Sequence, residues 1–161
     1  MLRDATLKDA DSIAAIWNPQ IRDTSVTFNS VEKSVEGLRA DIAAKADSGH
    51  AFLVAEQAER VIGFALYGQF RAGVGYAHSM EHTVYLSPAQ QGQGVGRVLM
   101  RALEARAAAA GVHSMLGGIS AENVGGIAFH TAIGYAEVAR IPQVGRKFGR
   151  WMDLVLMQKM L

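Results

Sequence analysis

Three glycines in the middle of the chain are the residues whose spacing points most clearly to chemistry. They are Gly92, Gly94 and Gly96 in the segment QQGQGVGRV, and a helical pattern of apolar residues follows them directly. Glycine allows left-handed backbone conformations and lets a ligand approach the main chain closely. The first N–H groups of a helix lack partners within the helix and lie at its positive end, so they bind anions. The segment therefore predicts a phosphate or pyrophosphate site, unless the glycines form only a flexible turn.

Two familiar phosphate-binding motifs fit this segment poorly. A P-loop requires a Lys followed by Ser or Thr after its last glycine, whereas Arg97 and Val98 follow Gly96. A dinucleotide fingerprint requires a third glycine where this chain has Arg97, and an acidic residue about twenty positions later. No acidic residue occurs between Glu104 and Glu122. The remaining interpretation is an anion site formed by backbone N–H groups, to which Arg97 adds a positive charge.

A second pattern, which has the residue types of a metal site, is rejected on geometry. His78, Glu81 and His82 fit H-x-x-E-H, an inverted zinc-peptidase motif that requires a helix. Glycines precede this segment and the β-rich TVYL follows it, so a strand is expected here. On a strand, the two imidazoles start about 13 Å apart, at roughly 3.3 Å per residue. They cannot share one ion, and no metal site is expected.

The composition limits the class of protein. A chain of 161 residues, half of them hydrophobic, has the size of one domain with a substantial core, so residues 1–161 are expected to form a single domain. The formal net charge of +1 argues against a nucleic acid partner. The chain has no cysteine, which fits a reducing cytoplasm. The N-terminus carries early acidic residues and no long apolar run, so a soluble cytoplasmic protein without a membrane partner is expected.

The remaining patterns indicate which elements must position these residues. Apolar residues at helical spacing predict a first helix that starts at Asp9 or Asp11 and ends at Pro19, and all three prolines are expected to mark the ends of elements. Further helices are expected over 31–46, from the glycines to Gly111, and over 123–133; strands are expected over 2–6, 50–56, 60–70, 81–87, 112–119, 134–140 and 149–160.

This order of elements predicts an α/β (α+β) fold, with a mixed, mostly antiparallel central sheet of about seven strands and helices on both faces. Both faces of the strand over 60–70 carry apolar residues, as expected for a covered sheet. The pattern places Ile62, Phe64 and Leu66 on one face and Val61, Ala65 and Tyr67 on the other.

The glycine segment also carries a family resemblance. Residues Gln91 to Gly96 resemble the Q/R-x-x-G-x-G/A acetyl-CoA signature of the GNAT N-acetyltransferase superfamily, and the order of elements is similar to that fold from end to end. More narrowly, EHTVYLSPAQQGQGVG, FHTAIGY and IWNPQIRDTSVTF resemble the phosphinothricin N-acetyltransferase branch, which includes enzymes acting on methionine sulfoximine and methionine sulfone. The resemblance implies the GNAT fold, acetyl-CoA as co-substrate, and transfer of an acetyl group to the primary amine of a small amino acid or analogue.

The resemblance also implies a set of cofactor contacts. The backbone of the strand before the glycines would pair with the pantetheine arm, the N–H of Leu86 would polarise the thioester carbonyl, and the glycine loop would hold the pyrophosphate. Asn123 matches an asparagine that contacts the cofactor arm, although it is equally suited to cap the next helix. The cofactor-binding residues implied in this way are Val84, Tyr85, Leu86, Gln91, Gly92, Gln93, Gly94, Val95, Gly96, Arg97 and Asn123.

Two side chains are implied as proton carriers. Attack on a thioester needs a neutral amine, so a general base is required, and Glu81 matches the glutamate of the family. An ordinary Glu is a weak base, so Glu81 must be desolvated or act through a water; otherwise it is only a carboxylate at a strand end. His130 occupies the position where many members have a tyrosine that protonates the departing thiolate. Either His130 supplies that proton or the thiolate leaves unaided.

The acceptor side is implied more loosely. Phe28 is expected to form one wall of the acceptor pocket, Arg71 to pair with a substrate carboxylate, and Tyr76, Glu81 and His82 to complete the set. Gly126 departs from the family pattern, because relatives carry a serine there, three residues after the asparagine.

Two other functions remain open. The chain is alternatively an acetyltransferase for a protein N-terminus or a polyamine, or a non-catalytic acetyl-CoA-binding sensor. The basic-to-neutral segment QFRAGVGYAH favours an acceptor with a carboxylate. Direct attack in a ternary complex is expected, because there is no cysteine to carry the acetyl group, and relatives of this branch pair as homodimers.

Overall fold

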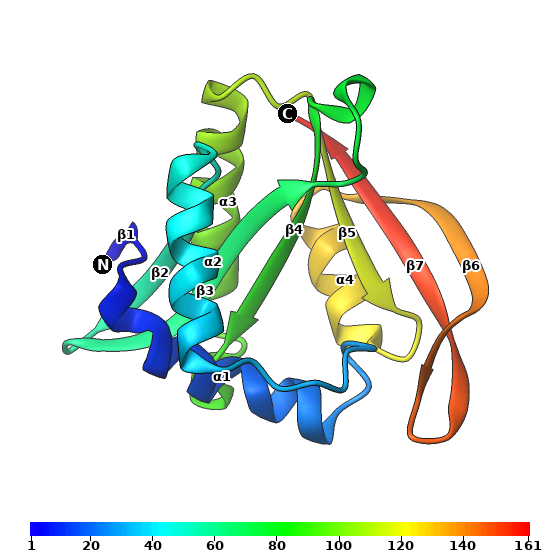
Figure 1. Cartoon of the computed structure of the whole chain (residues 1–161). Helices are drawn as coiled ribbons and strands as arrows, with labels where there is room; N and C mark the ends of the chain where they lie inside the picture. Colours follow the sequence, from blue (N-terminus) through cyan, green and yellow to red (C-terminus); the bar gives the residue numbers. More distant parts are fainter.

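A seven-stranded sheet with helices on both faces forms the centre of the computed structural model, which describes all 161 residues (Figure 1). The strand order is β1-β2-β3-β4-β5-β7-β6, and every neighbouring pair is antiparallel except β4 and β5. The strands are β1 (Leu2–Asp4), β2 (Phe52–Gln57), β3 (Arg60–Gln69), β4 (Ser79–Leu86), β5 (Ser114–Ser120), β6 (Ala136–Lys147) and β7 (Arg150–Met160). The helices are α1 (Ala10–Asp23), α2 (Val35–Asp47), α3 (Val95–Ala109) and α4 (Val124–Ala132), with short 3-10 turns η1 (Leu7–Asp9), η2 (Val74–Tyr76) and η3 (Pro88–Gln90). The predicted fold class is confirmed.

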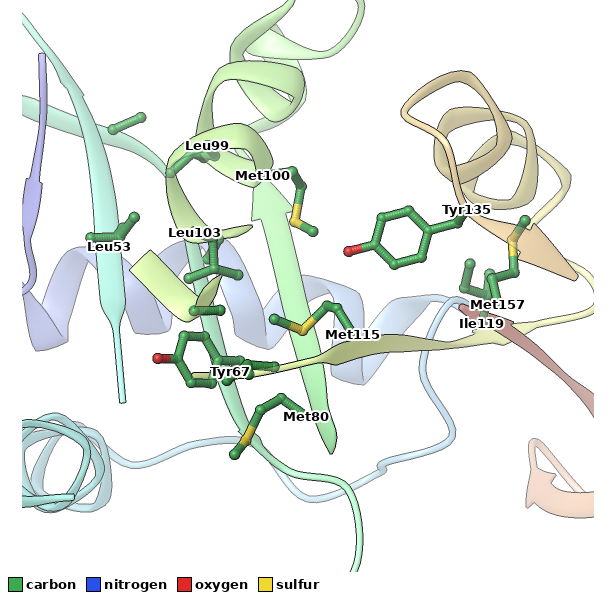
Figure 2. Packing of buried hydrophobic residues seen from close by; sticks show 14 of the residues in the cluster. Leu53, Tyr67, Met80, Leu99, Met100, Leu103, Met115, Ile119, Tyr135 and Met157 are labelled. Carbon is green, nitrogen blue, oxygen red and sulfur yellow. The ribbon is translucent and has the colours of Figure 1, made fainter. Parts of the chain in front are cut away.

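Two hydrophobic clusters cover the two faces of the sheet. On one face, Leu99 and Leu103 of α3 are fully buried against side chains of the central strands, including Tyr67 and Met115 (Figure 2). On the other face, residues of α1 and α2 pack around Phe64. Burial of a leucine side chain such as Leu99 contributes about 1.5–3 kcal/mol, so these clusters fix both helical layers to the sheet.

A β-bulge in the β2–β3 hairpin changes the expected alternation. Residues 64–67 of β3 face the clusters in the predicted alternating order. Val61 and Ile62 are exchanged: Ile62 packs against the cluster that contains α3, and Val61 packs against the cluster that contains α1 and α2. The register between the strands shifts between Ala55 and Glu56, so β3 carries an extra residue and its alternation restarts. The prediction for these two positions was wrong for that reason.

Two of the three prolines lie inside elements rather than at their ends. Pro19 lies within α1, which continues to Asp23 and buries Ile21 completely. Pro142 lies within β6, an edge strand where a missing N–H costs little, beside a register shift between β6 and β7. Only Pro88 stands at the start of a short turn after a strand. Helix α2 starts at Val35 instead of 31, because the hydroxyl of the preceding serine caps it.

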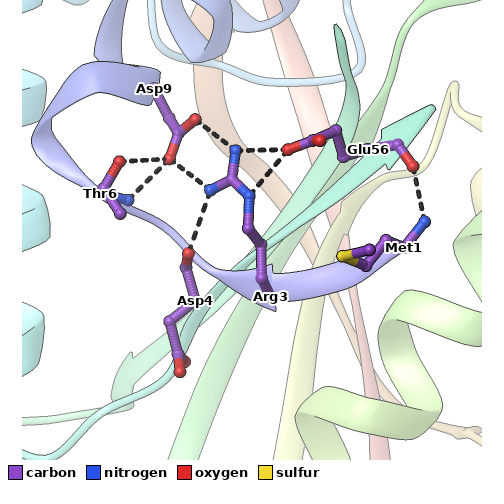
Figure 3. Close-up of polar contacts among 6 residues, drawn as sticks. All are labelled: Met1, Arg3, Asp4, Thr6, Asp9 and Glu56. Carbon is purple, nitrogen blue, oxygen red and sulfur yellow. Dashed lines mark hydrogen bonds and ion pairs between the residues drawn. The ribbon is translucent and has the colours of Figure 1, made fainter. Parts of the chain in front are cut away.

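A polar network fixes the start of α1 (Figure 3). The guanidinium of Arg3 donates two hydrogen bonds of 2.8 Å to the carboxylate of Asp9 and also bonds to Glu56 on β2. The N–H and hydroxyl of Thr6 donate to the same aspartate. The hydrogen bonds from Arg3 hold the pKa of Asp9 down to about 2. Helix α1, which leads into one wall of the site described below, therefore begins at a fixed position.

None of the four helices combines the length and the apolar character needed to cross a bilayer.

Candidate active site

The site begins where β4 and β5 separate. Parallel pairing joins residues 79–81 of β4 to 114–116 of β5, and beyond that point β5 pairs only with β7. In antiparallel pairs, backbone groups point alternately toward and away from the neighbouring strand. The carbonyl of Ser79 accepts a hydrogen bond from the N–H of Phe70 at the end of β3, and the N–H of Ser87 donates one to the carbonyl of Ile62 on β3. The backbone groups of the odd-numbered residues of β4 therefore face β3, and those of the even-numbered residues between them face away from it. The N–H and C=O groups of Val84 and Leu86 therefore face the gap between the strands.

A pocket of about 370 Å³ extends from this gap to the start of α3. It contains most of the predicted cofactor residues: the segment 84–86, Gln91, Gly92, Gly96 and Asn123 all line it, together with His130. Gln93, Gly94, Val95 and Arg97 do not line it, although Gln93 and Gly94 belong to the same turn and Val95 begins α3. Gln20, Val26, Gly125, Gly126 and Phe129 complete the lining.

The glycine segment has the geometry of an anion site. Gly92 and Gly94 have φ values of +75° and +83°, and a Cβ at either position would meet no atom within 4 Å. The amides of residues 92–97 donate no backbone hydrogen bond; the first helical bond runs from the N–H of Val98 to the carbonyl of Gly94. Gly96 has another purpose, since a Cβ there would lie 3.3 Å from the Phe129 ring of α4. Two glycines thus shape the turn, and the third brings the two helices together.

Arg97 does not point toward this turn. Its guanidinium is exposed and donates a hydrogen bond of 3.2 Å to the carbonyl of Ala132, at the end of α4. The positive character of the turn therefore comes from backbone amides and the helix dipole rather than from this side chain.

Asn123 both caps α4 and lines the pocket. Its Oδ1 accepts a hydrogen bond of 2.9 Å from the N–H of Gly126. A Cβ at position 126 would overlap the Asn123 amide, so glycine, where the family pattern has serine, leaves room for this cap. The Nδ2 group makes no hydrogen bond within the protein and is free to donate to a ligand.

Glu81 opens onto a separate pocket of about 330 Å³ on the α1 side of β4. Its side chain is accessible to solvent, yet the surrounding cleft desolvates the carboxylate and raises its pKa. Gly118 of β5 leaves space for it, because a Cβ there would lie 2.7 Å from Oε1. A carboxylate with a raised pKa in an accessible cleft is suited to accept a proton.

A small pocket of about 90 Å³ between β4 and β5 shares lining residues with both larger ones. Val26, Val84, Tyr85, Asn123 and His130 occur in this pocket and in the one beside the glycines. Val26, Tyr85, His82, Thr83 and Gly118 occur in this pocket and in the one beside Glu81. The gap between the strands thus adjoins both the side of the glycine turn and the side of the carboxylate.

A pair of buried histidines lies at this gap. The Nδ1 of His130 lies 2.7 Å from the carbonyl of Gly126, so it must carry the proton, and its Nε2 is an acceptor. The Nε2 of His82, 3.2 Å away, must then be the donor. This leaves the buried Nδ1 of His82 without a partner. Burial lowers the pKa of both rings, that of His82 to about 3, so both are neutral at pH 7.

The predicted acceptor residues are only partly brought together. Phe28, Glu81 and His82 line the pocket beside the carboxylate. Arg71 and Tyr76 do not; they lie in the exposed connection between β3 and β4, where the guanidinium stacks 5.6 Å from the tyrosine ring. Tyr85, which the sequence suggested only for the cofactor, also lines this pocket, and the lining residues that the sequence did not suggest are Trp17, Val26, Thr27, Asn29, Lys33, Thr83, Gly118, Ser120 and Leu154. Val26 and Thr27 belong to the segment IWNPQIRDTSVTF that carries the family resemblance, and proximity to Phe28 in the chain was the available signal for Asn29.

The H-x-x-E-H residues do not share a site. They lie on or beside strand β4, as expected, and not on a helix. The Nδ1 of His78 lies 2.7 Å from the carbonyl of Gly111, whereas His82 contacts His130. The two imidazoles of the pattern thus have separate partners.

Comparison with known proteins agrees with this geometry. A family model described as an acetyltransferase (GNAT) domain matches residues 2–156. The L-methionine sulfoximine/L-methionine sulfone acetyltransferase of Pseudomonas paraeruginosa is 38% identical over 158 residues, which are 98% of this chain and 92% of that protein. The phosphinothricin N-acetyltransferase of Alcaligenes faecalis is 33% identical over 154 residues, 95% of this chain and 78% of that protein.

Solved structures show the same similarity. The ribosomal-protein-alanine N-acetyltransferase from Brucella melitensis has a TM-score of 0.96 and 37% identity, covering 100% of this chain and 99% of that one. A GNAT superfamily phosphinothricin acetyltransferase from Sinorhizobium meliloti, in complex with acetyl-CoA, has a TM-score of 0.94 and 30% identity, covering 100% and 88%. The resemblance seen in the sequence is thereby confirmed. Since the matches span nearly the whole chain, this protein belongs to the GNAT acetyltransferase family.

Proposed function

We propose that this protein is an acetyl-CoA-dependent N-acetyltransferase that acts on the primary amine of a small amino acid or analogue, of the phosphinothricin, methionine sulfoximine or methionine sulfone type. The observation that carries the proposal is the cleft formed by these adjoining pockets. A free strand edge and unpaired helix amides open onto one side of it, and a carboxylate of raised pKa opens onto the other. The first side suits a thioester with a pyrophosphate, and the second suits an amine.

Acetyl-CoA would bind along the free edge of β4. Backbone groups of Val84 and Leu86 would pair with the pantetheine arm as a further strand would. The unpaired amides of residues 92–97 would hold the pyrophosphate at the start of α3. The free Nδ2 of Asn123 would donate to the arm from the opposite wall.

Glu81 would act as the general base. The proton of the attacking amine passes to its carboxylate, directly or through a water, as the new N–C bond forms. Burial raises the pKa of Glu81 toward that of the amine, which makes this proton transfer less unfavourable than it is for an ordinary carboxylate. The N–H of Leu86, facing the gap, would stabilise the negative charge that develops on the thioester oxygen.

The C–S bond then breaks and the thiolate departs. The hydrogen bonds of His130 favour unaided departure, because its single N–H is held by the carbonyl of Gly126 and its Nε2 accepts from His82. His130 would serve as an acid only after its Nε2 had taken up a proton. We therefore assign the histidine pair mainly to the shape of the gap.

The acceptor pocket favours a small zwitterion over a polycation. Phe28 and Trp17 provide apolar walls, and Lys33 brings a positive charge, its Nζ lying 4.9 Å from the Trp17 ring. We assign to Lys33, whose ammonium also lies 3.8 Å from the carboxylate of Asp41, the role that the sequence suggested for Arg71, which is to pair with a substrate carboxylate. The alternative acceptor, a protein N-terminus, is supported by the similarity of this chain to the ribosomal-protein-alanine N-acetyltransferase from Brucella melitensis.

The test is thiol release from acetyl-CoA with separate acceptors: phosphinothricin, methionine sulfoximine, methionine sulfone, spermidine and a short peptide that begins with alanine. Release with the three amino-acid analogues is the expected result. Release only with the peptide or spermidine would retain the acetyltransferase and refute this acceptor class. Binding of acetyl-CoA without release from any acceptor would favour a sensor.

We also infer that the protein works as a cytoplasmic homodimer without a nucleic acid partner. The net charge of +1 supports the absence of a nucleic acid partner, and the absence of cysteine supports the cytoplasm as the compartment. Exposed apolar side chains on the β6–β7 hairpin, such as Val144 and Trp151, support pairing. Light scattering of the purified protein would test the oligomeric state.

A further inference from the structure

One wall of the acceptor pocket is a segment without helix or strand. Residues 24–34 connect α1 to α2, and five of them line the pocket that contains Glu81: Val26, Thr27, Phe28, Asn29 and Lys33. Such a segment keeps one shape only where other parts of the protein hold it. Its far end is held by Asn18, whose side chain exchanges hydrogen bonds of 2.8 and 2.9 Å with the backbone of Lys33.

The near end is held by a buried lysine from a distant strand. Lys147 is the last residue of β6 and is only 5% exposed. Its Nζ donates hydrogen bonds of 2.6 Å to the carbonyl of Thr24 and 2.9 Å to the carbonyl of Thr27. No carboxylate lies within ion-pair distance of this ammonium. Asp23 acts on this ammonium only from beyond ion-pair distance, so the buried charge depends on the two hydrogen bonds, and the lysine and the segment fix each other.

A second contact couples the same strand to the pocket wall. Gly145, two residues before Lys147, is buried against Phe28, and a Cβ at position 145 would overlap the phenyl ring. Residues 145 and 147 share one face of β6, since side chains alternate along a strand. The end of β6 therefore supports the pocket wall at two points.

We propose that Lys147 is a positioning residue for the acceptor, which holds the segment 24–28 so that Phe28 and its neighbours form the pocket beside Glu81. The proposal rests on the proposed function, because it concerns the acceptor of that reaction. Lys147 touches neither substrate; it acts through the backbone carbonyls that it binds. The shape of the acceptor pocket, and with it the choice of acceptor, is set from the β6–β7 hairpin.

The test is Lys147→Met, which keeps the aliphatic stem and removes the donors. We expect the acceptor KM to rise about tenfold or more, because a small displacement of a pocket wall is costly, while the Kd of acetyl-CoA changes less than about threefold. Lys147→Arg, which keeps the charge and the donors, should restore part of the acceptor affinity. Lys159→Met is the matched control, because the Lys159 ammonium on β7 also makes two hydrogen bonds, to Glu104 and to the carbonyl of Ile133. It should lower thermal stability without raising the acceptor KM.

A second measurement does not depend on activity. Hydrogen–deuterium exchange of residues 24–30 should accelerate about tenfold or more in Lys147→Met, with the amides of α3 unchanged. The proposal would be overturned if the acceptor KM and the Kd of acetyl-CoA rose by the same factor, or if the acceptor KM did not change. Unchanged hydrogen–deuterium exchange of residues 24–30 would also overturn it. If the wild type acetylates none of the acceptors, the proposed function fails, and the exchange experiment still decides whether Lys147 holds the segment.

Discussion

Replacing Gly92 with alanine separates the cost of backbone strain from the cost of losing a ligand site. Gly92 has φ at +75° and lines the pocket proposed for acetyl-CoA, and an added Cβ would meet no protein atom within 4 Å. The methyl group therefore clashes with nothing in the protein itself. It adds bulk beside the unpaired amides of residues 92–97, where the proposed pyrophosphate would lie. Gly49, after α2, has φ at +71° and equally open surroundings, but it lies outside the site.

The magnitude follows from these geometries. A non-glycine residue in the left-handed region costs about 1–2 kcal/mol, so Gly92→Ala and Gly49→Ala should lower the melting temperature similarly, by about 2–4 °C per kcal/mol. Loss of one hydrogen bond to a charged ligand costs about 1.5–3 kcal/mol. Since 1.4 kcal/mol is a factor of ten, the Kd of acetyl-CoA should rise about tenfold to hundredfold in Gly92→Ala only.

Titration calorimetry with acetyl-CoA, and thermal unfolding of both variants without ligand, provide the two quantities. If both variants lost stability equally and Gly92→Ala still bound acetyl-CoA as the wild type does, the pyrophosphate would not lie on this turn. If both variants lost affinity equally, strain alone would explain the loss. Either result would refute the assignment of the glycine turn.

Two further predictions concern titrating groups. Glu81→Gln should lower kcat/KM about 10²- to 10⁴-fold. It should also remove the acid limb from the pH profile of kcat/KM, and this limb lies above pH 4.5 in the wild type because burial raises the pKa of Glu81. An unchanged acid limb would assign the general base to another group. The pKa of His82 falls from 6.5 to about 3 on folding, so the unfolded chain binds more protons between these values, and the free energy of unfolding should fall as the pH drops below about 6.5, by at most about 1.4 kcal/mol per pH unit. The free energy of unfolding, measured by urea unfolding at several pH values, should depend less steeply on pH in His82→Gln than in the wild type. An equal dependence on pH would contradict the assignment of His82 as neutral.

Sequence patterns predicted the sheet and the glycine turn because both depend on local features. Glycines at positive φ, a stopped strand and a helix start all follow one another within the segment around Gly92. The separation of β4 from β5 was not visible in the residues themselves, since a strand has the same period-two pattern whether its edge is paired or free. A free edge on this strand was implied only by the family resemblance, through the expected pairing of its backbone with the pantetheine arm. The exchange of Val61 and Ile62 was missed because a bulge depends on the partner strand.

Features formed by residues far apart in the chain could not be predicted. His82 and His130 are separated by 48 positions, and their tautomers are assigned only by the carbonyl of Gly126. Lys147 stands in the segment RKFGR, which looks like an ordinary hairpin end, and its burial follows from the distant carbonyls of Thr24 and Thr27. The continuation of α1 past Pro19 follows from the burial of Ile21, which is a property of the packed structure.

The central claim is that an amine beside Glu81 takes the acetyl group directly from acetyl-CoA held along β4. The most direct measurement is the initial rate of thiol release with both acetyl-CoA and methionine sulfone varied. Intersecting double-reciprocal lines, with one N-acetylated product formed per thiol released, are predicted for a ternary complex. Parallel lines, together with an acetylated protein detected by mass spectrometry when acetyl-CoA is added alone, would contradict direct transfer across the cleft.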